Sequence, residues 1–435
     1  MAQINTFLWG IATIMLISCG LYYTFKLRFT QFNFKKMFNG LSKDNSDRTS
    51  ISPFKTLTLA LAARIGVGSL AGIALGIYKG GIGVVFWIWI SALITLPNSF
   101  VESTLAVMFR KRDGKFYTGG PAYYIRDGLG LKKLGYTYAL IIFLSYIGGF
   151  IAIQSNTIAT SLNNFLNVPT VVTGIIISVV SYLVISHGLQ RIANFTALLV
   201  PIMGIIYMIV ALFIIVSNIN SIPSILSNIF REAFNFKAFG WGIISSIIIG
   251  VQRGIFSSEA GIGTGAVASG TSDTKYPCKQ GYLQMLGVYF TSFIICTSTV
   301  FIILTSNVDI NGFTNPNGIE ITLTALNDHL GSFGTIFLIF AILSFAFSTV
   351  LSGYYYGESN LKYLDKNVND KKILILNIFV VLILFYGAVA SPSFLWDIVD
   401  IGAAILAVIN TFAMLMLRKK VILEYQKERS DFYDR

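Results

Sequence analysis

The 435-residue sequence is poor in charged residues. Asp, Glu, Lys and Arg together make up 12% of the chain and hydrophobic residues make up 54%. Soluble globular chains average about 25% charged and about 45–50% apolar residues. So few charges cannot cover the surface of a soluble protein of this length. The composition therefore predicts an integral membrane protein.

Cysteine and histidine are also scarce. The three cysteines, Cys19, Cys278 and Cys296, lie in or beside apolar runs without C-x-x-C spacing, and there are two histidines. We therefore expect no disulfide framework, no metal centre and no cofactor. The chain also lacks a G-x-S-x-G elbow, an H-E-x-x-H pair and a P-loop lysine motif, so it has none of these common enzyme signatures. We expect that the protein is not an enzyme.

Long apolar runs dominate what is present. A bilayer core about 30 Å thick requires about 20 apolar residues per helix. Eleven stretches meet this length: 7–27, 53–80, 82–109, 134–162, 168–186, 190–217, 238–270, 276–306, 332–358, 372–389 and 393–417. The sequence predicts an all-α membrane protein with eleven transmembrane helices.

The basic residues predict the orientation of these spans. No basic residue precedes the first span, and Lys26 and Arg28 follow it, which places the N-terminus outside. With that start, 27 of the 32 Lys and Arg residues fall in cytoplasmic segments, and the outer segments hold Lys79, Arg231 and Lys237. The net charge of +12 then matches anionic inner-leaflet lipid rather than nucleic acid. We expect a cell-membrane protein with a cytoplasmic C-terminus and no obligate protein partner.

Two spans carry glycine clusters and charges at membrane depth. Span 53–80 contains Arg64 beside Gly66 and Gly68, and span 238–270 contains Arg253 and Glu259 in a glycine-rich run. A charge near the bilayer centre costs at least about 2.5–3.5 kcal/mol and faces protein or a water-filled cavity. Glycine clusters let the backbone leave the helix and free its N–H and C=O groups for a ligand. The alternative is a packing face of small residues at four-residue spacing.

The positions of the two interrupted spans suggest an internal repeat. With the first span set aside, they are the first members of two groups of five, and five spans is an odd number, so the groups have opposite topology. This pattern predicts an inverted-repeat transporter with its substrate at the midplane. The repeats are 53–217 and 238–417 within a core of 53–417. Segment 1–52 precedes this core as one helix and a basic loop, and a cytoplasmic tail, 418–435, follows it.

Several motifs carry a family resemblance. They are Ala63-Arg-Ile-Gly-Val-Gly-Ser, Gly119-Gly-Pro-Ala-Tyr-Tyr, Arg253-Gly-Ile-Phe-Ser-Ser-Glu-Ala-Gly and Phe345-Ala-Phe-Ser-Thr-Val-Leu-Ser-Gly. The sequence resembles the alanine or glycine:cation symporter family, within the amino acid–polyamine–organocation superfamily. The resemblance implies a LeuT-like core of five plus five helices after one N-terminal helix. It also implies sodium- or proton-driven uptake of a small neutral amino acid (alanine, glycine or glutamine) by alternating access.

The two breaks supply the expected substrate contacts. Backbone N–H groups at Gly66, Val67 and Gly68 should bind the substrate carboxylate, because amides at a helix break bind anions without a side chain. Backbone carbonyls at Phe256 and Ser257 should accept its ammonium group, and the Phe256 ring could cover the pocket.

Three further positions complete the expected substrate pocket. Gln154 corresponds to the family's glutamine motif, and its alternative role is a hydrogen bond between helices. Thr349 belongs to the Phe345 motif. Gly353 stands where the family often has Trp, which predicts room for a side chain larger than methyl, glutamine first. A Gly353→Trp variant should then select smaller substrates.

The resemblance also implies a sodium site. Carbonyls of Ala62 and Ile65 with hydroxyls of Ser348 and Thr349 fit its positions, and sodium is the co-substrate. Ser69 stands where the family has Asn, which keeps one oxygen but loses the amide. The alternative for the hydroxyls is a bond back to their own helix.

Buried charges are expected to form a gate or scaffold. Arg64 and Arg253 should pair with carboxylates such as Glu259 or Asp400. The polar segment 307–331 could form an outer lid.

Two transport alternatives stay open, proton-coupled transport and an ion channel. Broken helices in both halves favour alternating access over a permanent pore.

Overall fold

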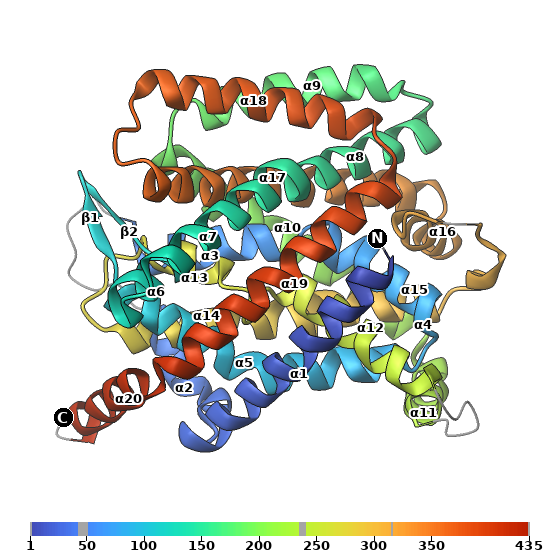
Figure 1. The fold of residues 1–435 in the computed structure, drawn as a ribbon. Coiled ribbons are helices and arrows are strands. Elements are labelled where there is room, and N and C mark those ends of the chain that lie inside the picture. Colours follow the sequence, from blue (N-terminus) through green and yellow to red (C-terminus); the bar gives the residue numbers. More distant parts are fainter. Residues whose placement is uncertain (1, 42–50, 235–240, 315, 434–435) are drawn as a thin grey trace.

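The computed structural model describes residues 2–41, 51–234, 241–314 and 316–433, and almost all of them are helical (Figure 1). Eight helices in these ranges are long and apolar enough to cross a membrane. They are α1 (Ala2–Lys26), α5 (Val84–Met108), the run α7 (Lys132–Phe143), η3 (Leu144–Phe150) and α8 (Ile151–Leu166), α10 (Leu189–Ser217), the run α14 (Pro277–Val288), η6 (Tyr289–Ile295) and α15 (Cys296–Leu304), α17 (Ser332–Leu364), α18 (Asp370–Val389) and α19 (Pro392–Met416).

The remaining three predicted spans are shorter or interrupted. One consists of α3 (Pro53–Arg64) followed by η2 (Gly68–Gly72) and α4 (Ile73–Gly80), with a bend of 50° between its halves. Another is α9 (Thr170–Ile185), which is apolar but shorter than the others. The last consists of α12 (Trp241–Ser258) and α13 (Thr264–Ser269). Within the described residues each predicted range therefore coincides largely with helical structure, and positions 238–240 of the range 238–270 lie outside them. The count of eleven transmembrane helices stays a prediction.

Short elements connect these helices. They are η1 (Thr30–Phe32), α2 (Phe34–Asn39), β1 (Lys111–Asp113), β2 (Phe116–Thr118), α6 (Pro121–Leu129), η4 (Ile219–Ser221), α11 (Ile222–Ala233), η7 (Ile310–Gly312), α16 (Ile319–Leu330) and α20 (Arg418–Tyr433). Strands β1 and β2 form an antiparallel hairpin in which Lys111 is opposite Thr118.

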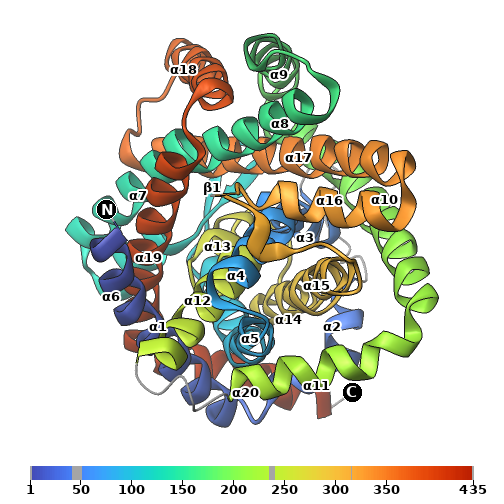
Figure 2. The ribbon, with the colours of Figure 1, turned by 90° about the vertical axis from the view of Figure 1, so that its right-hand side faces the viewer.

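The two chain ends lie at opposite ends of the bundle. The N-terminus lies at the end that holds α11 and α16, and α20 lies at the end that holds the β1–β2 hairpin (Figure 1). Opposite ends are what an odd number of spans requires. Helix α1 packs along α19 and α5, and α9 and α18 pack against each other and against α8 at the edge of the bundle (Figure 2).

The outer helices expose large apolar side chains. Leu212 on α10 is 61% exposed and Ile375 on α18 is 65% exposed. Apolar surface of this kind over whole helices is stable where lipid covers it. The interior is different, because it holds polar and charged side chains such as Glu102 and Asp400 at 0% and 3% exposure. Buried charges of this kind in a membrane bundle mark a functional region.

Candidate functional site

The first break separates α3 from η2. Helix α3 ends at Arg64, and Ile65 leaves the helical region with φ −89° and ψ 75°. The chain resumes at Gly68 as one π-helical turn. The predicted interruption of this span is therefore confirmed.

The second break separates α12 from α13. Between Ser258 and Thr264, residues Glu259, Gly261 and Gly263 have φ values of 53°, 93° and 99°. Glycine adopts this left-handed region at no steric cost. Glu259 has a Cβ, so its backbone is strained, and such outliers persist where the surrounding structure enforces them. The second predicted interruption is also confirmed.

The two broken spans touch each other in the middle of the bundle (Figure 2). A Cβ at Gly68 would lie 2.8 Å from Cδ1 of Phe256, and a Cβ at Gly66 would lie 2.4 Å from Oγ1 of Thr349 and 3.2 Å from Oε1 of Gln154. Glycine is required at both positions because the neighbours occupy the space of a side chain. Of the predicted substrate residues, Gly66, Gly68, Gln154, Phe256 and Thr349 therefore lie together.

Gln154 reaches directly into the first break. Its Oε1 accepts a hydrogen bond of 3.2 Å from the N–H of Val67. The Val67 N–H, which we expected to bind the substrate carboxylate, therefore donates to the side-chain oxygen of Gln154 in this state. In the second break, the Ser257 hydroxyl lies 2.9 Å from Sγ of Cys296. The carbonyl of Ser257 belongs to the last turn of α12, where helix carbonyls lack intrahelical partners.

Some of the predicted sodium ligands are adjacent. The Thr349 hydroxyl donates to the carbonyl of Ala62 at 2.8 Å and to that of Phe345 at 3.0 Å. The Ser348 hydroxyl donates to Phe345 at 2.8 Å, so it bonds back to its own helix. Ile65 is the C-cap residue of α3, three positions after Ala62.

Ser69 is engaged on another side of the break. Its hydroxyl donates to the carbonyl of Arg64 at 3.1 Å, and its own carbonyl accepts from Thr299 at 3.0 Å. These bonds hold the π turn to α3 and to α15.

Gly353 faces neighbouring side chains. A Cβ at this position would lie 3.3 Å from Cγ1 of Ile151 and 3.5 Å from Cδ1 of Tyr146. Position 353 therefore lies against α8 and η3, and the room expected there for a larger substrate side chain stays a prediction.

Arg253 and Asp400 form a buried ion pair. Nη2 of Arg253 lies 2.7 Å from Oδ2 of Asp400, and both side chains are 4% exposed. The guanidinium also lies 5.1 Å from the ring centroid of Trp396, within the range of a cation–π contact. The sequence left open which carboxylate pairs with Arg253, and the structure identifies Asp400.

A cavity of about 590 Å³ leads to this pair. Its lining includes Tyr78, Lys79, Asn317, Trp396 and Asp397. These residues come from three places: α4, α19, and the segment that precedes α16. The cavity therefore opens toward the end of the bundle that holds the N-terminus (Figure 1).

The expected pairing of Arg64 is wrong. Its Nη1 donates to the carbonyl of Gln284 at 3.2 Å and its Nη2 to the hydroxyl of Ser99 at 3.5 Å. The carboxylate of Glu259 instead accepts from the hydroxyl of Tyr146 at 2.5 Å. Gln284 on α14 and Ser99 on α5 offer neutral acceptors to the guanidinium, which accounts for the difference.

Sequence reasoning did not assign a role to Glu102 or Asn410. Glu102 is fully buried, and its Oε2 accepts from Nδ2 of Asn410 at 2.8 Å. Asn410 also donates to the carbonyl of Gly261 at 2.9 Å and accepts from the Tyr124 hydroxyl. The signal in the sequence was a charge inside the apolar run 82–109.

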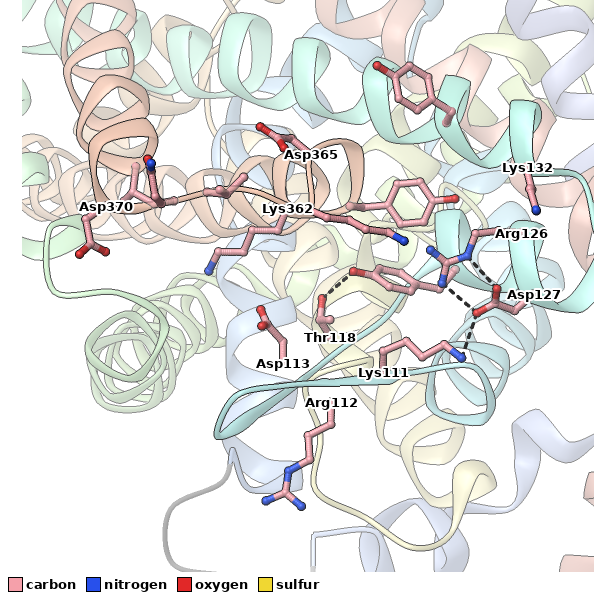
Figure 3. Close-up of a pocket in the computed structure, with 17 residues that line it drawn as sticks. Lys111, Arg112, Asp113, Thr118, Arg126, Asp127, Lys132, Lys362, Asp365 and Asp370 are labelled. Carbon is pink, nitrogen blue, oxygen red and sulfur yellow. Dashed lines mark hydrogen bonds and ion pairs between the residues drawn. The ribbon is translucent and has the colours of Figure 1, made fainter.

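A larger cavity, of about 1000 Å³, lies at the hairpin end of the bundle (Figure 3). Its charged side chains pair with one another: Asp127 accepts from Arg126 at 2.7 Å and lies 3.3 Å from Nζ of Lys111. The hydrogen bond from Arg126 lowers the pKa of Asp127. None of the predicted site residues line this cavity, so we do not assign it to the substrate.

Comparison with known proteins identifies the family of this chain. The family model described as "Sodium:alanine symporter family" matches residues 1–432. The amino-acid carrier protein AlsT of Bacillus subtilis is 39% identical over 99% of this chain and 92% of its own length. The probable sodium/glutamine symporter GlnT of the same organism is 38% identical over 96% and 87%. The sodium/alanine symporter AgcS of Methanococcus maripaludis is 32% identical over 97% and 95%.

Solved structures share the fold. The structure of MhsT in complex with L-phenylalanine matches with a TM-score of 0.61 and 12% identity, covering 84% of this chain and 88% of that one. A Na⁺-coupled sialic acid symporter matches with a TM-score of 0.54 and 15% identity, covering 91% and 82%. These similarities confirm the LeuT-like fold that the sequence resemblance implied. The chain belongs to the sodium:alanine symporter family and is a multi-pass membrane transporter, not an enzyme.

Proposed function

We propose that this protein couples the entry of sodium to the uptake of a small neutral amino acid, with alanine first and glycine and glutamine as the other candidates. The observation that carries the proposal is the meeting of two broken helices, where Gly68 packs on Phe256 and Gly66 packs on Thr349 and Gln154. The full-length relatives named for alanine, glutamine and sodium support the same assignment.

The polarity of the half-helices suits a zwitterionic substrate. The N-terminal ends of η2 and α13 carry partial positive charge, and the C-terminal ends of α3 and α12 carry partial negative charge. The substrate carboxylate therefore binds at the Val67 and Gly68 amides, and the Gln154 oxygen yields the Val67 N–H to it. The ammonium group binds at the carbonyls of Phe256 and Ser257.

Sodium binds beside the same break. Hard oxygen atoms are the ligands that such cations prefer, and the Ala62 carbonyl and the Thr349 hydroxyl already lie 2.8 Å apart. The ion replaces the hydrogen bond between them, and the Ile65 carbonyl and Ser348 hydroxyl complete its shell. Ser69 contributes to the site through the backbone that it holds in place.

Access from the N-terminal end passes the Arg253–Asp400 pair. The cavity above this pair is about 590 Å³, and α16 covers η2 through a bond of 3.2 Å from the Thr322 hydroxyl to the carbonyl of Leu70. Separation of the ion pair and withdrawal of α16 open the path. We assign this end to the outside of the cell and the hairpin end to the cytoplasm, in line with the distribution of Lys and Arg in the sequence.

The driving force is sufficient for concentrative uptake. One sodium ion that enters down the membrane potential releases about 2.3 kcal/mol per 100 mV. That energy allows roughly 50-fold accumulation of a neutral substrate, because about 1.4 kcal/mol corresponds to a factor of ten.

The test is uptake of radiolabelled alanine by the purified protein in proteoliposomes, with unlabelled glycine and glutamine as competitors. We expect saturable uptake that competing neutral amino acids reduce and that lysine and glutamate do not. Conductance without saturation would instead indicate a channel.

A further inference from the structure

A second polar cluster lies next to the second break, and we call it the inner cluster. It consists of Arg64, Glu102, Glu259, Tyr146 and Asn410. Arg64, Glu102 and Glu259 are 1%, 0% and 1% exposed. A Cβ at the neighbouring Gly265 would lie 2.4 Å from Nη2 of Arg64 and 3.6 Å from Oε1 of Glu102. Two carboxylates and one guanidinium therefore share one water-poor region.

The guanidinium does not form a close ion pair with either carboxylate. Its bonds go to the carbonyl of Gln284 and the hydroxyl of Ser99, and within the described ranges no salt bridge of 4.0 Å or less joins it to a carboxylate. Oε1 of Glu102 and Oε2 of Glu259 are buried and have no hydrogen-bond partner among the described residues. Each carboxylate thus has one buried oxygen that accepts no hydrogen bond from the described part of the chain, and Nε of Arg64 and the hydroxyl of Thr264 are likewise buried without a partner there.

The other titratable side chains around Glu102 and Glu259 are neutral. Groups that face Glu102 or Glu259 come from α1, α6, α7, η3 and α17. They are Cys19, Tyr124, Tyr138, Tyr146 and Tyr356. Thiols and phenols of this kind are uncharged at neutral pH. Among the described residues, Arg64 is therefore the one permanent positive charge that faces both carboxylates.

Charge balance then requires a proton. Two ionised carboxylates against one guanidinium leave one uncompensated negative charge in a fully buried region, which is strongly unfavourable. The 2.5 Å bond from Tyr146 to Glu259 has the length of a hydrogen bond to an ionised oxygen. The 2.8 Å bond from the Asn410 amide to Glu102 suits the carbonyl oxygen of a protonated carboxyl group equally well.

We propose that the Glu102–Glu259 pair is a proton-binding site that holds one proton, on Glu102, in the closed state and releases it to cytoplasmic water when the hairpin end opens. The inference builds on the proposed function, because it adds a proton to the sodium-coupled cycle. On release, the O–H bond of the Glu102 carboxyl group breaks, water takes the proton, and Glu102 stays behind as a carboxylate.

The position of Glu102 connects this proton to the second break. Glu102 lies near the C-terminal end of α5 (Val84–Met108), close to the β1–β2 hairpin. Asn410 bonds both Glu102 and the carbonyl of Gly261. The Asn410 amide therefore ties the unwound segment of the second broken span to α5 and α19, and ionisation of both carboxylates places an uncompensated negative charge at this junction.

The direct test is infrared spectroscopy of the purified full-length protein without substrate or sodium. A protonated buried carboxyl group gives a carbonyl-stretch band distinct from the carboxylate bands. We expect this band in the wild type at neutral pH and its loss in Glu102→Gln. We also expect its loss in Glu259→Gln, because removal of one negative charge lets the remaining carboxylate ionise against Arg64. The second variant keeps the test valid if the first fails to fold.

A matched control is Glu358→Gln. Glu358 is also buried, at 6% exposure, but it has its own cation, Lys362, at 2.7 Å. This variant should keep the band. A band that survives in either Glu102→Gln or Glu259→Gln would overturn the proposal.

The pH profile of uptake provides the functional readout. Wild-type alanine uptake should fall from mildly acidic to mildly alkaline pH as the pair loses its proton, whereas Glu102→Gln should show a flat profile. A structural role alone would lower uptake by the same factor at every pH, and that result would contradict the proposal. The infrared band is measured without transport, so the two proposals can fail separately. Absence of the band in the wild type would contradict the proton site and leave sodium symport untouched. Failure of uptake with the band present would contradict symport and leave the proton site untouched.

Discussion

The hydroxyl of Thr349 and the carbonyl of Ala62, which are 287 residues apart in the chain, are joined by a hydrogen bond of 2.8 Å. The bond ties α17 to the last turn of α3, directly before the first break. The carbonyls of this turn lie at the negative end of the α3 dipole. Helix α17 therefore presents an oxygen to a half-helix end that already favours a cation.

Substitution of Thr349 tests this arrangement. Thr349→Ala removes one oxygen and leaves the Ala62 carbonyl without its partner, which should cost about 1–2 kcal/mol of sodium binding, or roughly tenfold in apparent sodium affinity. Thr349→Ser keeps the hydroxyl and should stay close to the wild type. The measurement is the sodium concentration dependence of alanine uptake. Equal sodium dependence in the two variants would remove Thr349 from the site.

Gly66→Ala tests the contact between the first break and its neighbours. The new Cβ would lie 2.4 Å from Oγ1 of Thr349, and overpacking of this kind typically costs about 1–3 kcal/mol. We expect uptake to fall by at least about tenfold. Gly10→Ala on α1 is the control, because no described heavy atom lies within 4 Å of its Cβ position. Comparable loss of uptake in the two variants would argue against a site at Gly66.

Asp400→Asn tests the buried pair with Arg253. Removal of one partner leaves a buried charge uncompensated, which typically costs about 3–5 kcal/mol. Thermal unfolding in detergent should therefore show a clear loss of stability. The double variant Arg253→Met with Asp400→Leu removes both charges and should be more stable than Asp400→Asn. An unchanged melting temperature for Asp400→Asn would show that the pair contributes little.

Asp127 provides a pH-dependent prediction outside the membrane-spanning helices. The bond from Arg126 lowers the pKa of Asp127 in the folded state, so ionised Asp127 stabilises the fold above its unfolded pKa of about 3.9. This contribution is lost as the pH falls through the lower, folded value. Because the pair is partly exposed, Asp127→Asn should cost at most about 1 kcal/mol at neutral pH. The difference from the wild type should vanish in acid, and a difference that grows in acid would contradict this sign.

Much of the fold was accessible from the sequence because membrane spans depend on local properties. Run length and apolar composition set each helix, and glycines beside a charge marked both breaks at Gly66–Gly68 and around Glu259. The small number of buried charges indicated that Arg253 needs a carboxylate partner, but it did not distinguish Asp400 from Glu259. These features need no knowledge of how the helices pack.

Hydrogen-bond partners that depend on how the helices pack could not be predicted from the sequence. Arg64 bonds neutral groups on α14 and α5 because those helices happen to face its guanidinium. Glu102 is buried and accepts a hydrogen bond from Asn410, which in turn accepts one from Tyr124 on α6. Side chains of η3 and α8 lie beside Gly353. Each of these outcomes depends on contacts between residues that are distant in the chain, such as Arg64 with Ser99 and Glu102 with Asn410.

The sodium dependence of alanine uptake in proteoliposomes of the wild-type protein tests the central claim most directly. The account predicts concentrative uptake when sodium is high outside, and its loss when the sodium gradient is removed while the electrical potential is kept. Uptake of equal rate in sodium-free buffer, driven by a pH gradient alone, would contradict it.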